Sequence, residues 1–383
     1  MFSNFTTYSD SIFLYVMCML LSTFLAINAQ LVPKIKNVLI DGQIKKLRYP
    51  NVILICLSCV VMLMLAYYRD HVGLDFQSYI LIFDKASGKY VPDYLIADYS
   101  SIEKGFIWLN YIVARFGGNI YTLMGTSCAI MLGFMIPVWR DYGAKMSVAL
   151  SILGFFTTYF YISLNITRQF ISVGMLFYST KYMWQRKPIH FFVLVFISSL
   201  FHGSSWFFAL FYFAVGNKPF EKTFRKSLII GLVGITFMLS TIGNLFMGIP
   251  VVNAYLSKYG DVNMSFTVLF KIGNVILKSP AYIPILIFRK QLVEYDKRNS
   301  MWLLFVLAEF ISCFLGNISG LFLRPGIYLQ ISWIILLPQI VRIQKTRGKQ
   351  YLAGIYVILF FAGSYIYNFV YMNYGIVLPY KTF

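Results

Sequence analysis

The sequence predicts an all-α fold: a polytopic transmembrane bundle of about ten to twelve helices, each needing roughly 20 apolar residues to span a bilayer. Two observations carry this prediction. Of the 383 residues, 59% are hydrophobic and only 12% are charged, whereas soluble domains carry about 25% charged residues. A soluble chain this apolar could not cover its surface with polar groups, so most side chains must face lipid or one another. The apolar residues also gather in long runs between short charged segments.

These runs define the expected helices, and residues 1–383 are expected to form a single membrane domain without internal repeats or a soluble domain. Residues 105–117 are short for a span and could lie along the interface. Residues 190–215 are long enough to cross once, but the polar stretch Phe201–Ser205 interrupts them. The clear candidates for spanning helices are 11–32, 50–68, 119–139, 146–163, 166–185, 227–246, 266–288, 301–322, 325–341 and 351–371.

The charges predict which side of the membrane each loop faces. The net charge of +19 would suggest nucleic acid in a soluble protein, but here the accumulation of Lys and Arg in cytoplasmic loops explains it, and no nucleic-acid partner is expected. The external region 69–104 carries 4 basic and 6 acidic residues, so it and both termini are placed outside. Six segments with 22 basic and 5 acidic residues are placed in the cytoplasm: 33–49, 140–145, 181–187, 217–226, 289–298 and 342–349.

This topology raises a question about residues 190–215, because the segments on both sides of them are basic. A re-entrant hairpin that turns at His202-Gly203 would return the chain to the cytoplasmic side, and non-helical backbone is tolerated at depth where it lines a cavity. The alternative is a single span with one basic loop outside, which would force residues 105–117 or another segment to change status.

Several kinds of chemistry have no support in the sequence. There is no Walker A motif, no G-x-G-x-x-G and no H-E-x-x-H, which argues against an ATP-driven pump and a zinc protease. Cys56 and Cys59 form a C-x-x-C without a nearby His or second pair, so helix packing explains them better than zinc. No carboxylate cluster calls for a metal, and no metal or cofactor is predicted.

Charged residues within apolar segments are costly and therefore need a reason. Arg168 opens a helix at the outer face, where its guanidinium could bind an anionic group such as a phosphate or could reach for lipid head groups. His202 is the only His inside an expected span. It could act as a general base, or it could be a hydrogen-bonded packing residue.

A second group of such residues lies in the C-terminal half. Arg324, followed by Pro325 and one turn later by Tyr328, could hold a phosphate or cap a turn. Lys271 and Lys278 are seven residues apart and so share one helix face, which indicates a lined cavity. Glu309 could neutralise one of these cations. The candidate residues of this half are therefore Lys271, Lys278, Glu309, Arg324 and Tyr328.

The segment after the second apolar run, Arg69 to Tyr79, gathers acids, a His and an Arg at the outer surface. Asp75 within it could bind sugar hydroxyls, act as a base or pair with Arg69.

Five short motifs in this order resemble those of EpsG/Wzy-type polysaccharide polymerases. Arg69 to Tyr79 is similar to R-x-x-x-G-x-D-x-x-x-Y, Asn165 to Gln169 to N-x-x-R-Q, and Leu200 to Ser204 to L-F-H-x-S. Leu323 to Tyr328 resembles R-x-x-x-Y, and Leu378 to Tyr380 the terminal P-Y. The resemblance extends over nearly the whole chain. One departure is Leu74, where many relatives carry Thr, and it changes no charge.

The resemblance implies a glycosyltransferase of the bacterial inner membrane that joins oligosaccharide repeat units linked to polyprenyl diphosphate, at the external face. The glycan would leave its lipid diphosphate for a sugar hydroxyl of the next unit, so no ATP site is needed. Arg168 and Arg324 would neutralise the departing diphosphate, and His202 or Asp75 would take the proton. The implied partners are the lipid-linked oligosaccharide, membrane lipid and a chain-length-regulating membrane protein. The remaining substrate-binding candidates are Arg69, Tyr79, Gln169, Lys271, Lys278 and Tyr328.

Two other functions remain open at this stage. A lipid-linked oligosaccharide flippase would also use intramembrane cations, although it should show internal repeats and cations in both leaflets. A related membrane glycan ligase or acyltransferase would differ mainly in the acceptor that it uses.

Overall fold

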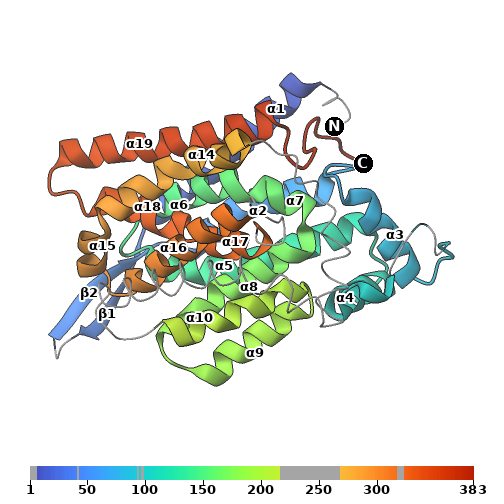
Figure 1. Ribbon diagram of the computed structural model, residues 1–383, viewed down its shortest axis with the longest axis horizontal. Coiled ribbons are helices and arrows are strands. Elements are labelled where there is room, and N and C mark those ends of the chain that lie inside the picture. Colours follow the sequence, from blue (N-terminus) through green and yellow to red (C-terminus); the bar gives the residue numbers. More distant parts are fainter. Residues whose placement is uncertain (1–6, 41–42, 93–94, 96–98, 216–267, 317–322) are drawn as a thin grey trace.

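The computed structural model describes residues 7–40, 43–92, 95, 99–215, 268–316 and 323–383. The predicted helix 227–246 and the basic segment 217–226 lie outside these residues. Figure 1 shows the helical bundle that the composition predicts. A small layer of short helices lies outside the bundle at one end and is called the external layer, and a β-hairpin that was not predicted lies at the other end.

The N-terminal part contains α1 (Tyr8–Leu31), β1 (Lys34–Ile40), β2 (Gln43–Tyr49), α2 (Val52–Tyr68), α3 (Phe76–Ala86), α4 (Lys104–Arg115), α5 (Ile120–Tyr142), α6 (Val148–Phe155), α7 (Tyr161–Asn165), α8 (Thr167–Trp184), α9 (Pro188–Ser199), η4 (Gly203–Phe208) and α10 (Ala209–Ala214). The C-terminal part contains α14 (Val268–Ile287), α15 (Arg289–Tyr295), α16 (Asn299–Gly316), α17 (Leu323–Gln330), α18 (Trp333–Arg342) and α19 (Arg347–Tyr365).

Four of the described helical segments are long and apolar enough to cross a membrane: Tyr8–Leu31, Ile120–Tyr142, Val148–Asn165 and Arg347–Tyr371. The third continues from α6 to α7 through a π-helical turn at Phe156–Phe160. Shorter apolar helices, such as α2, complete the bundle. The part of the chain that the structure describes contains one sheet, the hairpin of β1 and β2. In it Lys34 pairs with Tyr49, within a basic segment that was expected to be a loop.

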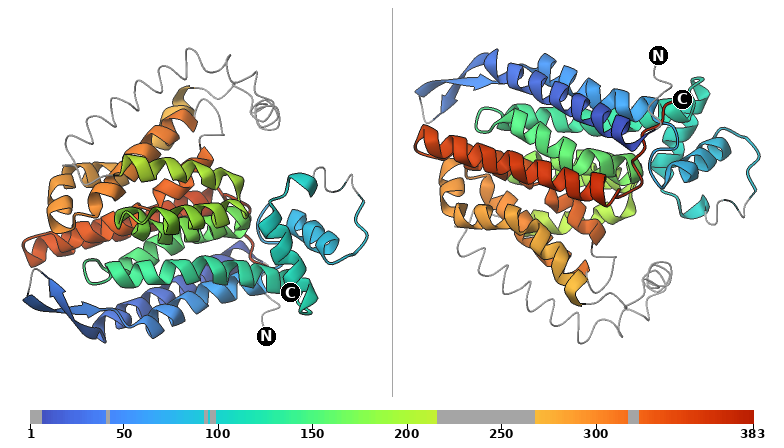
Figure 2. Two further views of the ribbon diagram at one scale, coloured as in Figure 1. Left: turned by 90° about the horizontal axis from the view of Figure 1, so that it is seen from below. Right: turned by 90° about the horizontal axis from the view of Figure 1, so that it is seen from above.

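The two ends of the bundle differ in charge as the sequence predicts. The basic β-hairpin and α15 lie together at one end, and the external region with α3 and α4 lies at the other (Figures 1 and 2). The start of α1 and the C-terminus lie at the end with α3 and α4. There the Tyr380 hydroxyl donates to the Leu65 carbonyl at 2.9 Å, and the Asp70 N–H donates to the Lys381 carbonyl at 2.8 Å.

Residues 190–215 form the hairpin that the flanking charges indicate. The chain rises along α9, turns at His202-Gly203 and returns through η4 and α10. Arg186, just before α9, donates to the carbonyls of Tyr212 at 2.8 Å and Val215 at 2.7 Å, so both ends of the hairpin meet at the basic end. The alternative of a single span is therefore wrong.

Residues 105–117 do not span. They form α4, a helix of 12 residues that packs against α3 outside the bundle (Figure 2). Trp108, Tyr111 and Phe116 are exposed on it, which fits a helix at the membrane interface because Trp and Tyr favour that position.

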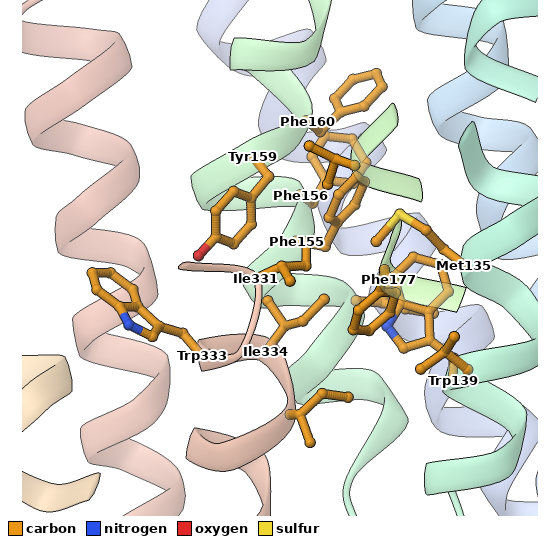
Figure 3. Close-up of a cluster of buried hydrophobic side chains, with 14 of the residues drawn as sticks. Met135, Trp139, Phe155, Phe156, Tyr159, Phe160, Phe177, Ile331, Trp333 and Ile334 are labelled. Carbon is orange, nitrogen blue, oxygen red and sulfur yellow. The ribbon is translucent and has the colours of Figure 1, made fainter. Parts of the chain in front are cut away.

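The core at the centre of the bundle is dense in large side chains. Figure 3 shows Met135 and Trp139 of α5 gathered with Phe155, Phe177 and Ile334. The buried Trp139 indole N–H donates to Ser151 at 2.9 Å, so even its polar atom is satisfied. This packing joins α5, α6, α8 and α18 into one body.

The predicted helix 325–341 is broken into α17 and α18 between Gln330 and Trp333. A break inside a bundle frees backbone groups that need partners. The Tyr159 hydroxyl supplies one, donating to the Gln330 carbonyl at 2.7 Å. Because of this break, α17 is a short helix of eight residues at the end of the bundle where α3 and α4 lie.

Candidate functional site

An ion pair between the external layer and the bundle forms the centre of the site. Arg168 lies in the first turn of α8, and its Nη1 is 2.5 Å from Oε2 of Glu103, the residue that precedes α4. The guanidinium also lies over the Phe106 ring at 5.8 Å. The side chain of Arg168 is 28% exposed, so part of this cation remains open at the end of the bundle.

His202 reaches the same carboxylate from the turn of the hairpin. Its Nδ1 lies 3.3 Å from Oε1 of Glu103, and the Gly203 N–H donates to that oxygen at 3.0 Å. The Gly105 N–H donates to the Leu200 carbonyl at 2.8 Å, which ties α4 to the hairpin. Both His202 ring nitrogens are shielded from solvent and lack an aligned hydrogen bond within the described chain. The imidazole therefore forms part of the wall beside Glu103.

These contacts control the ionisation of Glu103. Burial alone would raise the pKa of its carboxyl, but His202, the Arg168 guanidinium and the Gly203 N–H together lower the pKa to about 2. Glu103 is therefore a carboxylate throughout the physiological range. The sequence had not singled it out, because its partners lie in segments far along the chain.

Asp75 lies at the start of α3, and its pKa is shifted in the opposite direction to that of Glu103. Burial raises the pKa of its carboxyl, and the nearby Arg168 and Arg324 guanidinium groups offset this only in part. Its backbone N–H donates to Oδ1 of Asn165 at 2.9 Å. The approach requires Gly73, which has φ +100° and would place a Cβ 2.9 Å from the Leu164 carbonyl oxygen.

Two further motif segments meet at this place. Gln169 is buried, and its Nε2 donates to the Arg324 carbonyl at 2.9 Å. The Tyr328 hydroxyl, one turn further along α17, lies 2.9 Å from Oγ of Ser204 in the hairpin. Helix α17 is thus fixed to both α8 and the hairpin, with Arg324 at its outer end.

Arg69 and Tyr79 lie behind these residues. Arg69 is 1% exposed and donates to the Val72 carbonyl at 3.0 Å, to Thr167 Oγ1 at 3.1 Å and to the Leu164 carbonyl. It therefore holds the segment before Asp75 against the start of α8. Tyr79 is buried against Phe106, with ring centroids 5.7 Å apart.

Of the two lysines predicted to bind substrate, Lys278 does not join this group. Lys278 pairs with Glu309 at 2.8 Å, the neutralisation that the sequence had left open. The Tyr282 hydroxyl donates to the other Glu309 oxygen. Lys271 lies in α14, but its side chain falls outside the described residues. We refer to Asp75, Glu103, Arg168, His202 and Arg324 as the outer cluster, and to Lys278 and Glu309 as the inner pair.

Similarity to a known protein family extends over this part of the chain. The sequence profile of the EpsG family matches residues 52–382, which include every member of the outer cluster. The chain belongs to the EpsG family. No curated protein and no solved structure matches the chain. Membership of the EpsG family, together with the apolar helices, supports a membrane-integral protein with a polysaccharide-polymerase-like role.

Proposed function

We propose that the protein is a glycosyltransferase that polymerises oligosaccharide repeat units carried on polyprenyl diphosphate. One observation carries the proposal: residues from four separate motif regions and the external layer converge on the outer cluster, at the end of the bundle away from the basic loops. Such a convergence of cations, carboxylates and an imidazole can supply both charge stabilisation and a base for group transfer from a diphosphate.

The charge distribution supports an orientation. The β-hairpin, Arg186 and α15 bring basic residues to one end, and basic loops face the cytoplasm by the positive-inside tendency. We therefore place the outer cluster at the external face of the bacterial inner membrane, where lipid-linked repeat units would be joined.

The two arginines are assigned to the diphosphate. As the bond to the sugar breaks, negative charge grows on the leaving lipid diphosphate, and fixed cations lower the free energy of that transition state. Arg168 is partly exposed and is held in place by Glu103. Arg324 lies near the start of α17, and both guanidinium groups lower the pKa of Asp75. A diphosphate between them would meet positive charge on two sides.

Asp75 is assigned as the general base. Its pKa is raised while that of Glu103 is lowered to about 2, and environments that drive two carboxyl groups apart in this way separate their roles. The acceptor hydroxyl would give its proton to Asp75, while its oxygen forms the new bond to the anomeric carbon. The old bond to the diphosphate oxygen breaks, and its electron pair leaves with the lipid diphosphate.

Glu103 and His202 are assigned to positioning. The shielded ring nitrogens of His202 make direct proton transfer from substrate less suitable than transfer to the partly exposed Asp75. Glu103 instead links His202 and Arg168, so the imidazole keeps the carboxylate and hence the guanidinium in place. Arg69, Gln169 and Tyr328 brace the same segments through the contacts described above.

The experiment that tests this function is reconstitution of the purified protein in lipid vesicles with a lipid-diphosphate-linked repeat unit. We expect products spaced by one repeat unit on a gel, with one lipid diphosphate released for each unit joined. Movement of the same lipid across the vesicle bilayer without such a ladder would instead establish a flippase and overturn the proposal.

A further inference from the structure

A cavity of about 620 Å³ lies on the other side of α17 from the outer cluster, among α14, α16, α17, α18 and α19. Its volume is within the roughly 300–1,000 Å³ typical of ligand sites. Nothing in the proposed chemistry uses this space.

The cavity follows α19 along one face. The contributing residues recur with helical spacing along the continuous segment Arg347–Tyr371, which extends beyond α19. From the first to the last the chain advances 12 positions, or about 18 Å at 1.5 Å per residue. The helix runs from the basic end towards the outer end, so this face extends from the middle of the bundle to the neighbourhood of the outer cluster. The residues are Tyr356, Leu359, Phe360, Gly363, Tyr367 and Asn368.

The wall combines apolar surface, which suits a hydrocarbon chain, with polar side chains such as Ser312, Gln330 and Asn368. Leu277 of α14 and Leu359 and Phe360 of α19 supply apolar surface, and Gly363 leaves room, since a Cβ built there meets nothing within 4 Å. The inner pair lines the cavity too, but Lys278 and Glu309 neutralise each other at 2.8 Å. The wall therefore presents no net charge from this pair to an occupant.

Helix α17 joins the cavity to the site. On one side of this eight-residue helix, Arg324 contacts α8 and Tyr328 contacts the hairpin. On the other side, the residues that line the cavity are Gly326, Ile327 and Gln330. Because an α-helix is only about 10 Å across, a single amphiphile can bind Arg324 with its head group and pass beside α17 into the cavity.

The membrane side of the cavity is also open to such a ligand. Helix α19 lies along the surface of the bundle in the right-hand view of Figure 2. Ile355 and Leu359 on it are 52% and 66% exposed, as expected of a helix in contact with lipid. An acyl or prenyl chain can therefore approach the cavity along this exposed apolar face.

We propose that this cavity binds the hydrocarbon tail of the lipid diphosphate whose head group occupies the outer cluster. The inference rests on the proposed function and adds to it a tail site formed by α14, α17 and α19. In this arrangement α17 lies between the two parts of the lipid, with the charged head group on one side of the helix and the hydrocarbon tail on the other.

The test fills the cavity with Gly363→Leu, which removes space without touching the outer cluster. Gly354→Leu is the matched control, because Gly354 lies on the same helix, also has open space around its Cβ and does not line this cavity. We expect Gly363→Leu to raise the KM for a long-chain lipid-linked donor about tenfold, a loss of a few buried methylene contacts. For a short-chain donor with the same sugar, the wild type, Gly363→Leu and Gly354→Leu should all have the same KM.

Equal loss for long-chain and short-chain donors in Gly363→Leu, or unchanged KM for the long chain, would overturn the tail site while leaving the polymerase proposal intact. If the wild type joins neither donor, the proposed function fails separately. In that case a second measurement tests the tail site, namely photo-crosslinking with a prenyl diphosphate that carries a photoreactive group at its tail. Label in α14 and α19 that excess prenyl diphosphate removes supports the site. Equal removal by a phospholipid would show an ordinary bilayer contact and overturn it.

Discussion

The outer cluster and the inner pair each contain a carboxylate beside a cation, yet they differ in what surrounds them. The Arg168–Glu103 distance is 2.5 Å and the Lys278–Glu309 distance is 2.8 Å. Glu103 is 19% exposed, whereas Glu309 is 1% exposed. The outer carboxylate therefore lies close to the surface where a ligand could bind Arg168, whereas the loss of Lys278 would leave the inner carboxylate buried without a charge partner.

Their partners differ as well. Both oxygens of Glu309 are engaged, one by Lys278 and the other by Tyr282. Beside Glu103, in contrast, the imidazole of His202 has no aligned hydrogen bond within the described residues, and Asp75 keeps a raised pKa between two arginines. A partly exposed carboxyl group near two cations, such as Asp75, indicates a place for substrate, whereas a buried pair with every polar atom engaged indicates a structural role. This difference leads to the following predictions.

The largest effect is expected at Asp75. Replacement by Asn removes the proposed base without changing size, and loss of a general base typically lowers kcat by about 10²–10⁴-fold. The measurement is the initial rate of repeat-unit joining. Asp84→Asn is the control, since Asp84 lies in the same α3 but pairs with Lys89 at the surface at 2.7 Å. Comparable rates for Asp75→Asn and the control would remove Asp75 from the chemistry.

The next test compares the two glutamates directly. Glu103→Gln should lower kcat about 10- to 100-fold, because Arg168 loses the contact that orients it. Glu309→Gln should instead lower the free energy of unfolding by roughly 2–4 kcal/mol, since it leaves Lys278 without a charge partner. Its kcat with a short-chain donor should be retained. Kinetics and chemical unfolding of both variants in detergent measure these effects.

A double variant, Lys278→Met with Glu309→Leu, sharpens this comparison. Replacing a buried ion pair by apolar groups of similar size is often neutral, so most of the lost stability should return. If Glu309→Gln instead abolished joining of short-chain donors at unchanged stability, the inner pair would belong to the catalytic site.

A smaller effect is expected on pH dependence. The Asp75 base works when ionised, so activity falls as pH drops through its raised pKa. The positive charge of Arg324 lowers that pKa, and Arg324→Gln should therefore shift the acid limb of kcat to higher pH by roughly 0.5–1 unit. Arg324→Lys keeps the charge and should keep the wild-type limb. Identical limbs in both variants would argue against Asp75 as the titrating group.

The smallest effect concerns stability and pH at Glu103. Its pKa is lowered to about 2 in the folded protein, against about 4.3 when unfolded. Ionised Glu103 thus stabilises the fold above pH 5, and this contribution is lost as the pH falls from about 4 towards 2. The difference in Tm between wild type and Glu103→Gln should be constant above pH 5 and shrink below pH 4. A difference independent of pH would mean that the ion pair contributes nothing measurable.

Much of the fold follows from composition and charge alone. Long apolar runs give the bundle, and the basic residues on both sides of 190–215 indicate the hairpin that Arg186 closes. The break between α17 and α18 had no such signal, because Gln330 to Trp333 contains no helix-breaking residue. It depends on packing and on the Tyr159 hydroxyl from another helix, and local sequence does not report such contacts.

The candidate site was predictable where a residue carries its own signal. Arg168 and His202 stand out as polar groups in apolar runs, and the structure brings both to one carboxylate. That carboxylate, Glu103, is one of six acids in the external region, and its place beside α8 and the hairpin arises only from folding. Lys278 is also a charged residue within an apolar run, but the sequence around it does not show on which side of α17 its side chain lies.

The central claim is that the outer cluster carries out transfer from the lipid diphosphate, and Arg168 tests it most directly. Arg168→Ala and the control Arg115→Ala each remove one arginine from the same end of the molecule, the latter from an exposed position on α4. Both would be purified, shown to fold and assayed for a repeat-unit ladder. The account predicts a loss of about 100-fold or more for Arg168→Ala and a normal ladder for Arg115→Ala. Unchanged polymer length and yield in Arg168→Ala would contradict it.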